Sequence, residues 1–134
     1  MNDPDTAGVN FAPTLVIHAN GAAGKQLAEQ LKHAGFAADS VDSCGAALTA
    51  ARSRHYGSMI FVGDLSQPND LQCIAGLRWQ APGTCWIIMI SSTELQDSRQ
   101  LFLHYGVDAL IHTPFSMKDL VSRLMAFSQR SRPA

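Results

Sequence analysis

The sequence predicts an α/β fold, a doubly wound parallel sheet of five strands with helices on both faces. Short apolar or β-branched runs alternate five times with longer segments of helical periodicity. The runs at residues 59–62 and 86–90 are apolar at every position, as expected for parallel strands covered on both faces. Right-handed crossovers and short loops restrict five such units to a doubly wound sheet. Ligand sites in such sheets lie at the carboxyl ends of the strands.

Each strand and its following helix can be placed along the chain in order. Residues 14–17 form a short β-branched and apolar run, and residues 22–34 carry Ala23, Leu27 and Leu31 at helical spacing before Gly35. The pattern recurs in four further expected strand and helix pairs: 37–41 with 44–55, 58–62 with 69–80, 84–91 with 94–105, and 109–111 with 117–128.

The residues at the ends of these segments agree with the periodicity. Gly35 and Gly106 follow helical runs, where a glycine commonly ends a helix in the left-handed conformation. Asn69 and Ser116 stand where side chains that cap a helix N-terminus are expected. We therefore expect one domain over residues 14–128, with a mobile leader at 1–13 and a polar tail at 129–134.

Composition limits the classes of function. Apolar residues make up 46% of the 134-residue chain and charged residues 16%, which is globular and too weakly charged for a nucleic-acid coat. The net charge of −1 names no partner. No apolar run approaches the roughly 18 residues of a membrane span, and the first residues lack the pattern of a signal peptide. We expect a cytoplasmic protein that does not bind membranes, with nucleic-acid binding disfavoured.

Three cysteines, Cys44, Cys73 and Cys85, are scattered along the chain. Their number is odd, and neither a C-x-x-C pair nor a metal-type cysteine and histidine set is present. We expect buried reduced thiols and no metal site.

One segment resembles a known family. Residues 106–115 read Gly-Val-Asp-Ala-Leu-Ile-His-Thr-Pro-Phe and are similar to the G-A-D-D-Y-L-x-K-P-F segment of bacterial response-regulator receiver domains, which are CheY-like. Residues 27–36 resemble the first helix of that family and its exit, and Tyr56 stands where an aromatic residue often precedes the third strand. The resemblance covers residues 14–128. It implies a flavodoxin-like (βα)5 sheet with strand order 2-1-3-4-5.

The resemblance also assigns the positions of the phosphorylation pocket. The acidic pair after the first strand falls on His18 and Ala19, and the phosphoacceptor aspartate falls on Val62. The hydroxyl residue after the fourth strand falls on Ser91, and the family's lysine falls on Thr113. Of these positions, Ser91 alone keeps the family's chemistry.

These replacements remove the chemistry of phosphotransfer. Magnesium in such sites is held by carboxylates together with water and phosphate, which Ala19 and Val62 cannot replace. An acyl phosphate needs a carboxylate nucleophile and nearby cations, and Val62 and Thr113 supply neither. We expect no metal, no cofactor and no enzymatic activity.

Asp64 is the main alternative. It lies two residues beyond Val62 and could be a displaced phosphoacceptor, although it is more simply a loop carboxylate that shapes the turn before Pro68. His18 and Asp64 both lie near the carboxyl edge, and we hypothesise an ion pair between them that acts as a pH-sensitive clamp. A histidine bonded to water or backbone is the simpler interpretation.

Two other motifs have weaker signals. Residues 20–25 contain Gly21, Gly24 and Lys25, but the spacing and the following Gln26 depart from a phosphate-binding loop, so we expect a flexible turn into the first helix. No G-x-S-x-G turn is present, and no nucleophile triad can be assembled from the cysteines and histidines.

The segment from 94 to 128 contains a candidate surface for protein partners, which we call the partner face. Receiver domains, which the chain resembles, commonly contact their signalling partners through this region. It is apolar here at Leu101, Leu103, Tyr105 and Leu110, and Leu101 and Leu103 cannot share one buried helix stripe. Leu110 stands where the family often has an aromatic switch residue. The basic residues Lys118, Arg123, Arg130 and Arg132 lie at the end of the chain.

We therefore expect a pseudo-receiver that signals independently of phosphorylation. It would act by binding a regulated protein or a second copy of the chain. A sensor of a cyclic dinucleotide and a receiver with its phosphoacceptor at Asp64 are the alternatives.

Overall fold

The computed structural model describes residues 12–64, 67–81, 83, 85–92 and 104–130. Within them five parallel strands form one sheet in the order β2-β1-β3-β4-β5, which confirms the predicted fold class and strand order. The expected helix over 94–105 lies almost wholly outside the described residues. In chain order the elements are β1 (Thr14–His18), α2 (Gly21–His33), β2 (Ala38–Val41), α3 (Cys44–Ser53), β3 (Ser58–Gly63), α4 (Pro68–Gln80), β4 (Trp86–Ser91), β5 (Ala109–His112) and α6 (Met117–Ser128).

The segment after β1 differs from the expectation. Helix α2 begins at Gly21, so the flexible turn predicted over residues 20–25 is wrong. Asn20 explains the earlier start, because its Oδ1 accepts a hydrogen bond from the Ala23 N–H at 3.1 Å and so caps the first turn. The helix amides that a phosphate-binding loop would offer are partly used by this cap.

Other helix ends follow the sequence with one exception. Ser116 caps α6 by accepting the Asp119 N–H at 3.0 Å, as predicted. Gly35 and Gly106 have positive φ angles of 102° and 74°, which confirms the left-handed conformation expected of them. The predicted cap Asn69 is wrong, because α4 already begins at Pro68. Proline is favoured in the first turn since its missing N–H would have no partner there.

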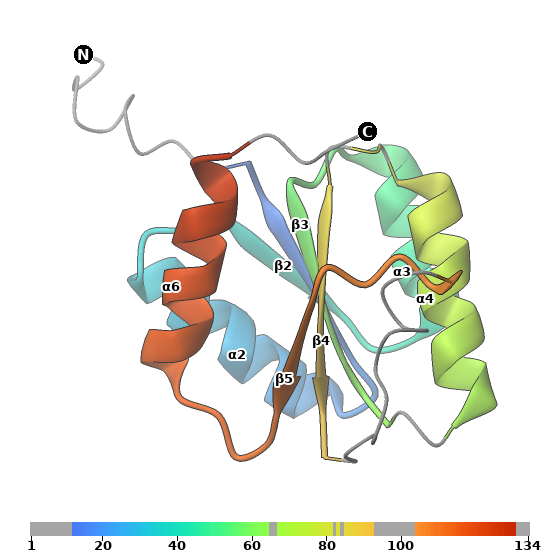
Figure 1. Ribbon diagram of the computed structural model, residues 1–134, viewed down its shortest axis with the longest axis horizontal. Coiled ribbons are helices and arrows are strands. Elements are labelled where there is room, and N and C mark those ends of the chain that lie inside the picture. The colour runs from blue at the N-terminus through green and yellow to red at the C-terminus, as the bar shows by residue number, and fades with distance from the viewer. Residues whose placement is uncertain (1–11, 65–66, 82, 84, 93–103, 131–134) are drawn as a thin grey trace.

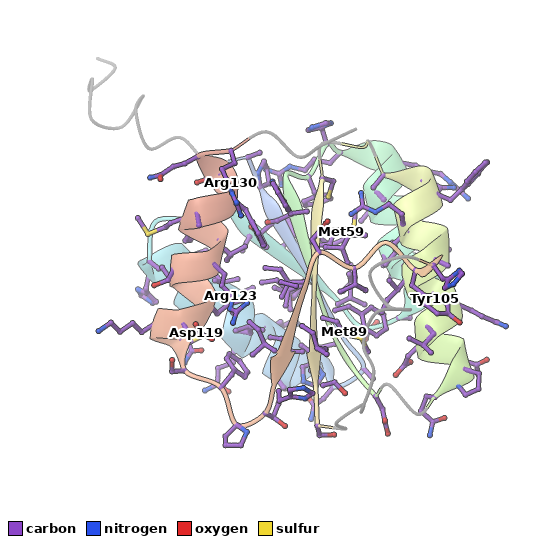
Figure 2. All side chains as sticks on the ribbon, in the orientation of Figure 1. Met59, Met89, Tyr105, Asp119, Arg123 and Arg130 are labelled. Carbon is purple, nitrogen blue, oxygen red and sulfur yellow. A yellow bond between two sulfur atoms is a disulfide. The ribbon has the colours of Figure 1, made fainter. Side chains whose placement is uncertain are left out.

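Among the described residues, helices cover both faces of the sheet (Figure 1). Helices α2 and α6 lie on one face, and α3 and α4 lie on the other. Successive strand residues point to opposite faces, so Leu15 and Ile17 pack under α3 and α4 while Val16 packs under α2 and α6. Met59 of β3 and Met89 of β4 lie on the α3 and α4 side (Figure 2).

The α2 and α6 face is closed by an aromatic pair at the start of β4. The rings of Trp86 and Phe127 stack with their centroids 4.2 Å apart, and the Arg130 guanidinium lies 5.6 Å from the Trp86 centroid. This contact fixes the end of α6 against the sheet.

None of the helices in the described ranges combines the length and the apolar character that crossing a bilayer requires.

Candidate functional site

The strand register brings the predicted pocket residues to one edge of the sheet. His18 pairs with Val62 across β1 and β3, and Gly63 pairs with Ser91 across β3 and β4. Ser91 in turn pairs with His112 of β5, directly before Thr113. The carboxyl ends of four strands therefore meet where a doubly wound sheet places its ligand site.

His18 is held by its own loop. Its Nδ1 accepts a hydrogen bond from the Asn20 N–H at 3.0 Å. A Cβ at Gly24 would lie 3.1 Å from the His18 Cβ, so the glycine lets α2 pack close to this side chain. No ion pair joins His18 and Asp64 among the described residues, so this structure does not contain the hypothesised clamp.

The end of β3 carries an apolar side chain where a phosphoacceptor would stand. Val62 is partly buried and packs against the core cluster under α2 and α6. Ala19, after β1, is exposed and offers only a methyl group. These two positions supply no oxygen ligand from a side chain.

Asp64 lies in the loop between β3 and α4 and is partly buried. Its N–H donates to Asp70 Oδ2 at 2.9 Å, and its carbonyl oxygen accepts the Gln67 N–H at 3.0 Å. Asp70 belongs to the first turn of α4, where a carboxylate is favoured by the helix dipole. The loop backbone is thus fastened to α4 through a residue that the sequence analysis did not single out, although its place in a first helical turn was readable.

Ser91, at the end of β4, and Thr113, directly after β5, form the part of this sheet edge next to β3. Ser91 is fully buried at 0% exposure, and its carbonyl oxygen accepts the Thr113 N–H at 3.0 Å. Thr113 is exposed and precedes Pro114 through a cis peptide bond. Its short hydroxyl side chain occupies the position that the resemblance assigns to a lysine.

Within the described ranges, no three His, Cys, Asp or Glu side chains gather closely enough to hold a metal ion.

Half of the predicted partner face can be placed. Leu101 and Leu103 lie outside the described residues. Tyr105 and Leu110 are both partly buried and pack against the core cluster under α3 and α4. Figure 2 shows Tyr105 beside α4. Part of each of these two side chains is therefore used in packing the core, and only the remaining exposed part is open to a partner.

The expectation of three reduced thiols is wrong for two of them. Cys44 and Cys73 form a disulfide, with their Cα atoms 5.9 Å apart, while Cys85 remains a buried thiol. The two bonded residues are separated by 29 positions and lack any motif spacing. The available signal was topological, since the two cysteines fall in the first two turns of the helices that follow β2 and β3, the strands on either side of β1.

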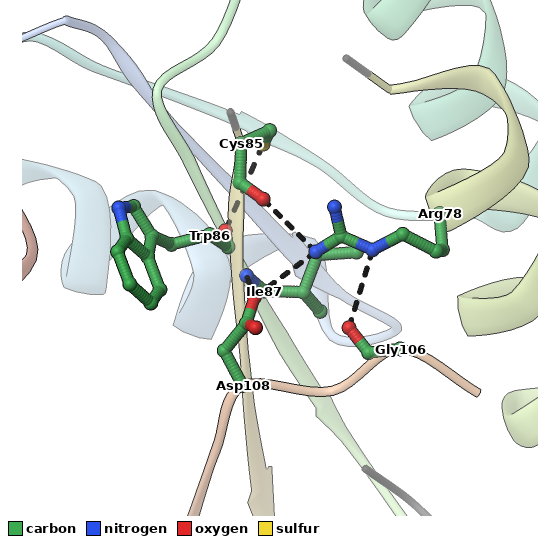
Figure 3. Close-up of polar contacts among 6 residues, drawn as sticks. All are labelled: Arg78, Cys85, Trp86, Ile87, Gly106 and Asp108. Atoms are coloured by element: carbon green, nitrogen blue, oxygen red, sulfur yellow. Dashed lines mark hydrogen bonds and ion pairs between the residues drawn. The ribbon is translucent and has the colours of Figure 1, made fainter. Parts of the chain in front are cut away.

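A second unexpected feature is a buried polar network between α4 and β4 (Figure 3). Arg78 Nη2 donates to the Cys85 carbonyl oxygen at 2.9 Å and to Asp108 Oδ2 at 3.0 Å, and its Nε donates to the Gly106 carbonyl oxygen at 3.2 Å. Asp108 Oδ2 also accepts the Ile87 N–H at 2.8 Å. This network joins α4 to the start of β4 and the segment before β5.

Comparisons with known proteins show where this fold occurs. No family profile matches the sequence, and no curated protein matches it. Solved structures do match, among them a CheY-like receiver domain protein of Methanospirillum hungatei JF-1, with a TM-score of 0.77, 17% identity, and coverage of 89% of this chain and 94% of that chain. A two-component response regulator from Clostridium difficile gives a TM-score of 0.77 at 20% identity, covering 89% of this chain and 97% of that one.

A third neighbour was solved with a bound metal ion. It is the receiver domain of a sensor histidine kinase from Pseudomonas aeruginosa PAO1 with a magnesium ion in its active site cleft. Its TM-score is 0.74 at 19% identity, with coverage of 90% of this chain and 99% of that chain. The chain thus has the CheY-like receiver fold, and these identities establish the fold alone.

Proposed function

We propose that this chain is a receiver-like signalling domain that works through protein contacts and without phosphotransfer at the usual position. One observation carries the proposal: the next-to-last residue of β3 is Val62, a partly buried valine paired with His18 and Ile90. A valine has neither the nucleophilic oxygen of an acyl-phosphate acceptor nor a ligand for magnesium. All five strands of the sheet are present around it, which favours a scaffold that kept its shape and changed its input.

The absence of phosphotransfer is tested with a small phosphoryl donor. The purified chain is incubated with acetyl phosphate and magnesium, and intact mass spectrometry measures covalent phosphoryl addition. We expect none in the wild type. Phosphorylation that disappears in Asp64→Asn, but persists in the matched control Asp42→Asn, would instead identify Asp64 as a displaced acceptor.

Partner binding is assigned to the partner face, of which Tyr105 and Leu110 are described. Tyr105 is partly exposed next to α4 and combines apolar area with a polar tip, a combination common at protein interfaces. A pull-down compares the wild type with Tyr105→Ser. Trp79→Ser is the control, because Trp79 is an aromatic side chain 89% exposed on α4. If Trp79→Ser loses binding and Tyr105→Ser does not, the contact surface lies on α4 and not on the partner face.

The nucleotide-sensor alternative has less support from the described residues. Arg123 is paired with Asp119 at 3.5 Å, and Arg130 lies over Trp86 and Phe127. Two members of the basic end are thus engaged within the chain. Calorimetry with a cyclic dinucleotide remains the direct test, and heat of binding that disappears in Lys118→Gln would revive this alternative.

A further inference from the structure

The Cys44–Cys73 disulfide joins two helices next to the candidate site. Cys44 is the first residue of α3, and Cys73 lies in the second turn of α4. Both helices cover the same face of the sheet, and the two cysteines lie toward their N-terminal ends, at the edge where the strands end. The bond therefore lies toward the same edge of the sheet as Val62 and the β3–α4 loop, although the Val62 side chain packs on the opposite face.

The two sulfur atoms have unequal surroundings. Cys44 is partly exposed at the start of a helix whose N-cap is Ser43, and the amides and dipole of such a first turn stabilise a thiolate. Cys73 is only 6% exposed and belongs to the core cluster under α3 and α4. Cys44 is thus suited to meet a small oxidant, and Cys73 is suited to resolve the product from within.

We propose that Cys44 and Cys73 are a redox-reactive dithiol, a modification site whose substrate is a hydroperoxide or a disulfide reagent. Disulfides in a reducing compartment are usually transient and catalytic or redox-sensing, so a pair in a chain expected in the cytoplasm fits a reversible role. This site does not depend on the proposed signalling role, since the pair would form whether or not a partner binds.

The reaction balances with hydrogen peroxide as oxidant. The Cys44 thiolate attacks one peroxide oxygen, the O–O bond breaks, and Cys44 becomes a sulfenic acid while the departing hydroxide takes a proton to form water. The Cys73 thiolate then attacks Cys44 Sγ, the S–S bond forms, and the second hydroxide leaves and becomes water with the proton released by Cys73. Two thiols and one peroxide give one disulfide and two waters. An external dithiol reverses the result by thiol–disulfide exchange.

The bond is connected to the β3–α4 loop through α4. Asp70 lies one helical turn before Cys73, and Asp70 Oδ2 holds the Asp64 N–H at 2.9 Å. Tying Cys73 to α3 restrains this part of α4 and, through Asp70, the loop two residues beyond Val62. Oxidation therefore acts at the edge of the sheet where phosphorylation acts in receivers that possess the acceptor.

The test measures the thiol state of the folded chain. The reduced protein is exposed to hydrogen peroxide, alkylated and digested, and mass spectrometry identifies the linked peptides. We expect a Cys44–Cys73 link that a dithiol reduces without denaturant, and slower hydrogen exchange in α4 when the link is present. The matched control Cys85→Ser should behave as the wild type, whereas Cys44→Ser and Cys73→Ser should form no intramolecular link.

Two results would overturn the proposal. The first is that Cys44 and Cys73 remain alkylatable after peroxide treatment that oxidises free thiols, which would show that the pair does not react. The second is that the link resists a dithiol until denaturant unfolds the chain, which would make it a permanent structural cross-link. Reduced wild-type protein serves as the folding reference for both cysteine variants.

Discussion

At the scale of single residues, Tyr56 is the clearest case of an environment changing a side chain's chemistry. It is 4% exposed, and its hydroxyl donates to Asp39 Oδ2 at 2.7 Å. Arg54 Nη1 lies 2.6 Å from the same carboxylate oxygen. Burial, and then the hydrogen bond to the Asp39 carboxylate, raise the pKa of Tyr56 to about 12 because both disfavour the phenolate.

This pKa predicts a pH dependence of stability. The folded value lies above the ordinary value of 10.0, so the stabilisation from Tyr56 is complete below about pH 10 and is lost as the pH rises toward about 12. Absorbance titration of tyrosinate in the folded chain should show a late step that Tyr56→Phe removes. Tyr105→Phe is the control and should leave that step in place. A late step that persists in Tyr56→Phe would contradict the assignment.

Arg78 predicts a second effect at this scale. Its side chain is 18% exposed and that of Asp108 is 12% exposed, so removing one partner leaves the other charge in a largely buried site. We expect Arg78→Met to lower the free energy of unfolding by about 2 to 4 kcal/mol, measured by urea denaturation.

The matched control is Arg123→Met, which breaks the exposed pair with Asp119 on α6. Exposed ion pairs in helices contribute about 0.5 kcal/mol or less, so this variant should unfold nearly as the wild type does. Figure 2 shows both members of this pair on α6. If Arg78→Met and Arg123→Met lower the free energy of unfolding equally, the Arg78–Asp108 network stabilises the chain no more than an exposed ion pair does.

At the scale of elements, helix ends are set by residues close in sequence. Asn20, Ser43 and Ser116 each accept a backbone N–H three residues ahead, and each stands one residue before its helix begins. Gly35 follows α2 with a φ of 102°. These ends could be inferred without tertiary contacts, because each cap involves a single turn of chain. Asn20 and Ser43 were nevertheless not singled out as caps.

Alanine substitutions at two glycines test the effect of backbone conformation apart from the effect of side-chain packing. A Cβ at Gly35 would meet nothing within 4 Å, but its positive φ makes alanine costly, so Gly35→Ala should destabilise by about 1 to 2 kcal/mol. Gly76 lies inside α4, where an added Cβ would make an ordinary 3.8 Å contact with Leu48, so Gly76→Ala should stabilise by about 0.5 to 1 kcal/mol. Thermal unfolding followed by circular dichroism measures both, and shifts of the same sign would refute the argument.

At the scale of the whole molecule, the described helices cover the two faces of the sheet as two separate pairs. The α3 and α4 pair is cross-linked by the Cys44–Cys73 bond, whereas the α2 and α6 pair relies on apolar packing and the Trp86–Phe127 stack. A change in the thiol state therefore affects one face of the molecule directly and the other only through the sheet.

The cross-link predicts a redox-dependent stability. Closing a loop between residues 29 apart restricts the unfolded chain, which corresponds to roughly 3 to 4 kcal/mol in the loop-entropy model. Urea denaturation with and without a dithiol should show this difference in the wild type. The Cys85→Ala chain should be less stable overall but keep the same difference, whereas Cys44→Ala should lose it. A difference that survives in Cys44→Ala would place its origin elsewhere.

Periodicity by itself determined the class of the fold. Alternating apolar runs and helical segments identified the five strands and the four described helices to within a few residues, because strand and helix patterns are local properties of the chain. The family-like segment at 106–115 then supplied the strand order. The resemblance over residues 14–128, with Tyr56 before the third strand, supplied the position of Val62, whose apolar character could be read directly from the sequence.

Tertiary structure alone decided which side chains meet. Cys44 bonds Cys73, and Arg78 reaches Asp108 across a separation of 30 residues, because helix packing on one face of the sheet brings these positions together. His18 Nδ1 accepts the Asn20 N–H two residues away, and no ion pair joins His18 to Asp64 among the described residues. Contacts of this kind depend on register and on helix packing, which sequence periodicity does not specify.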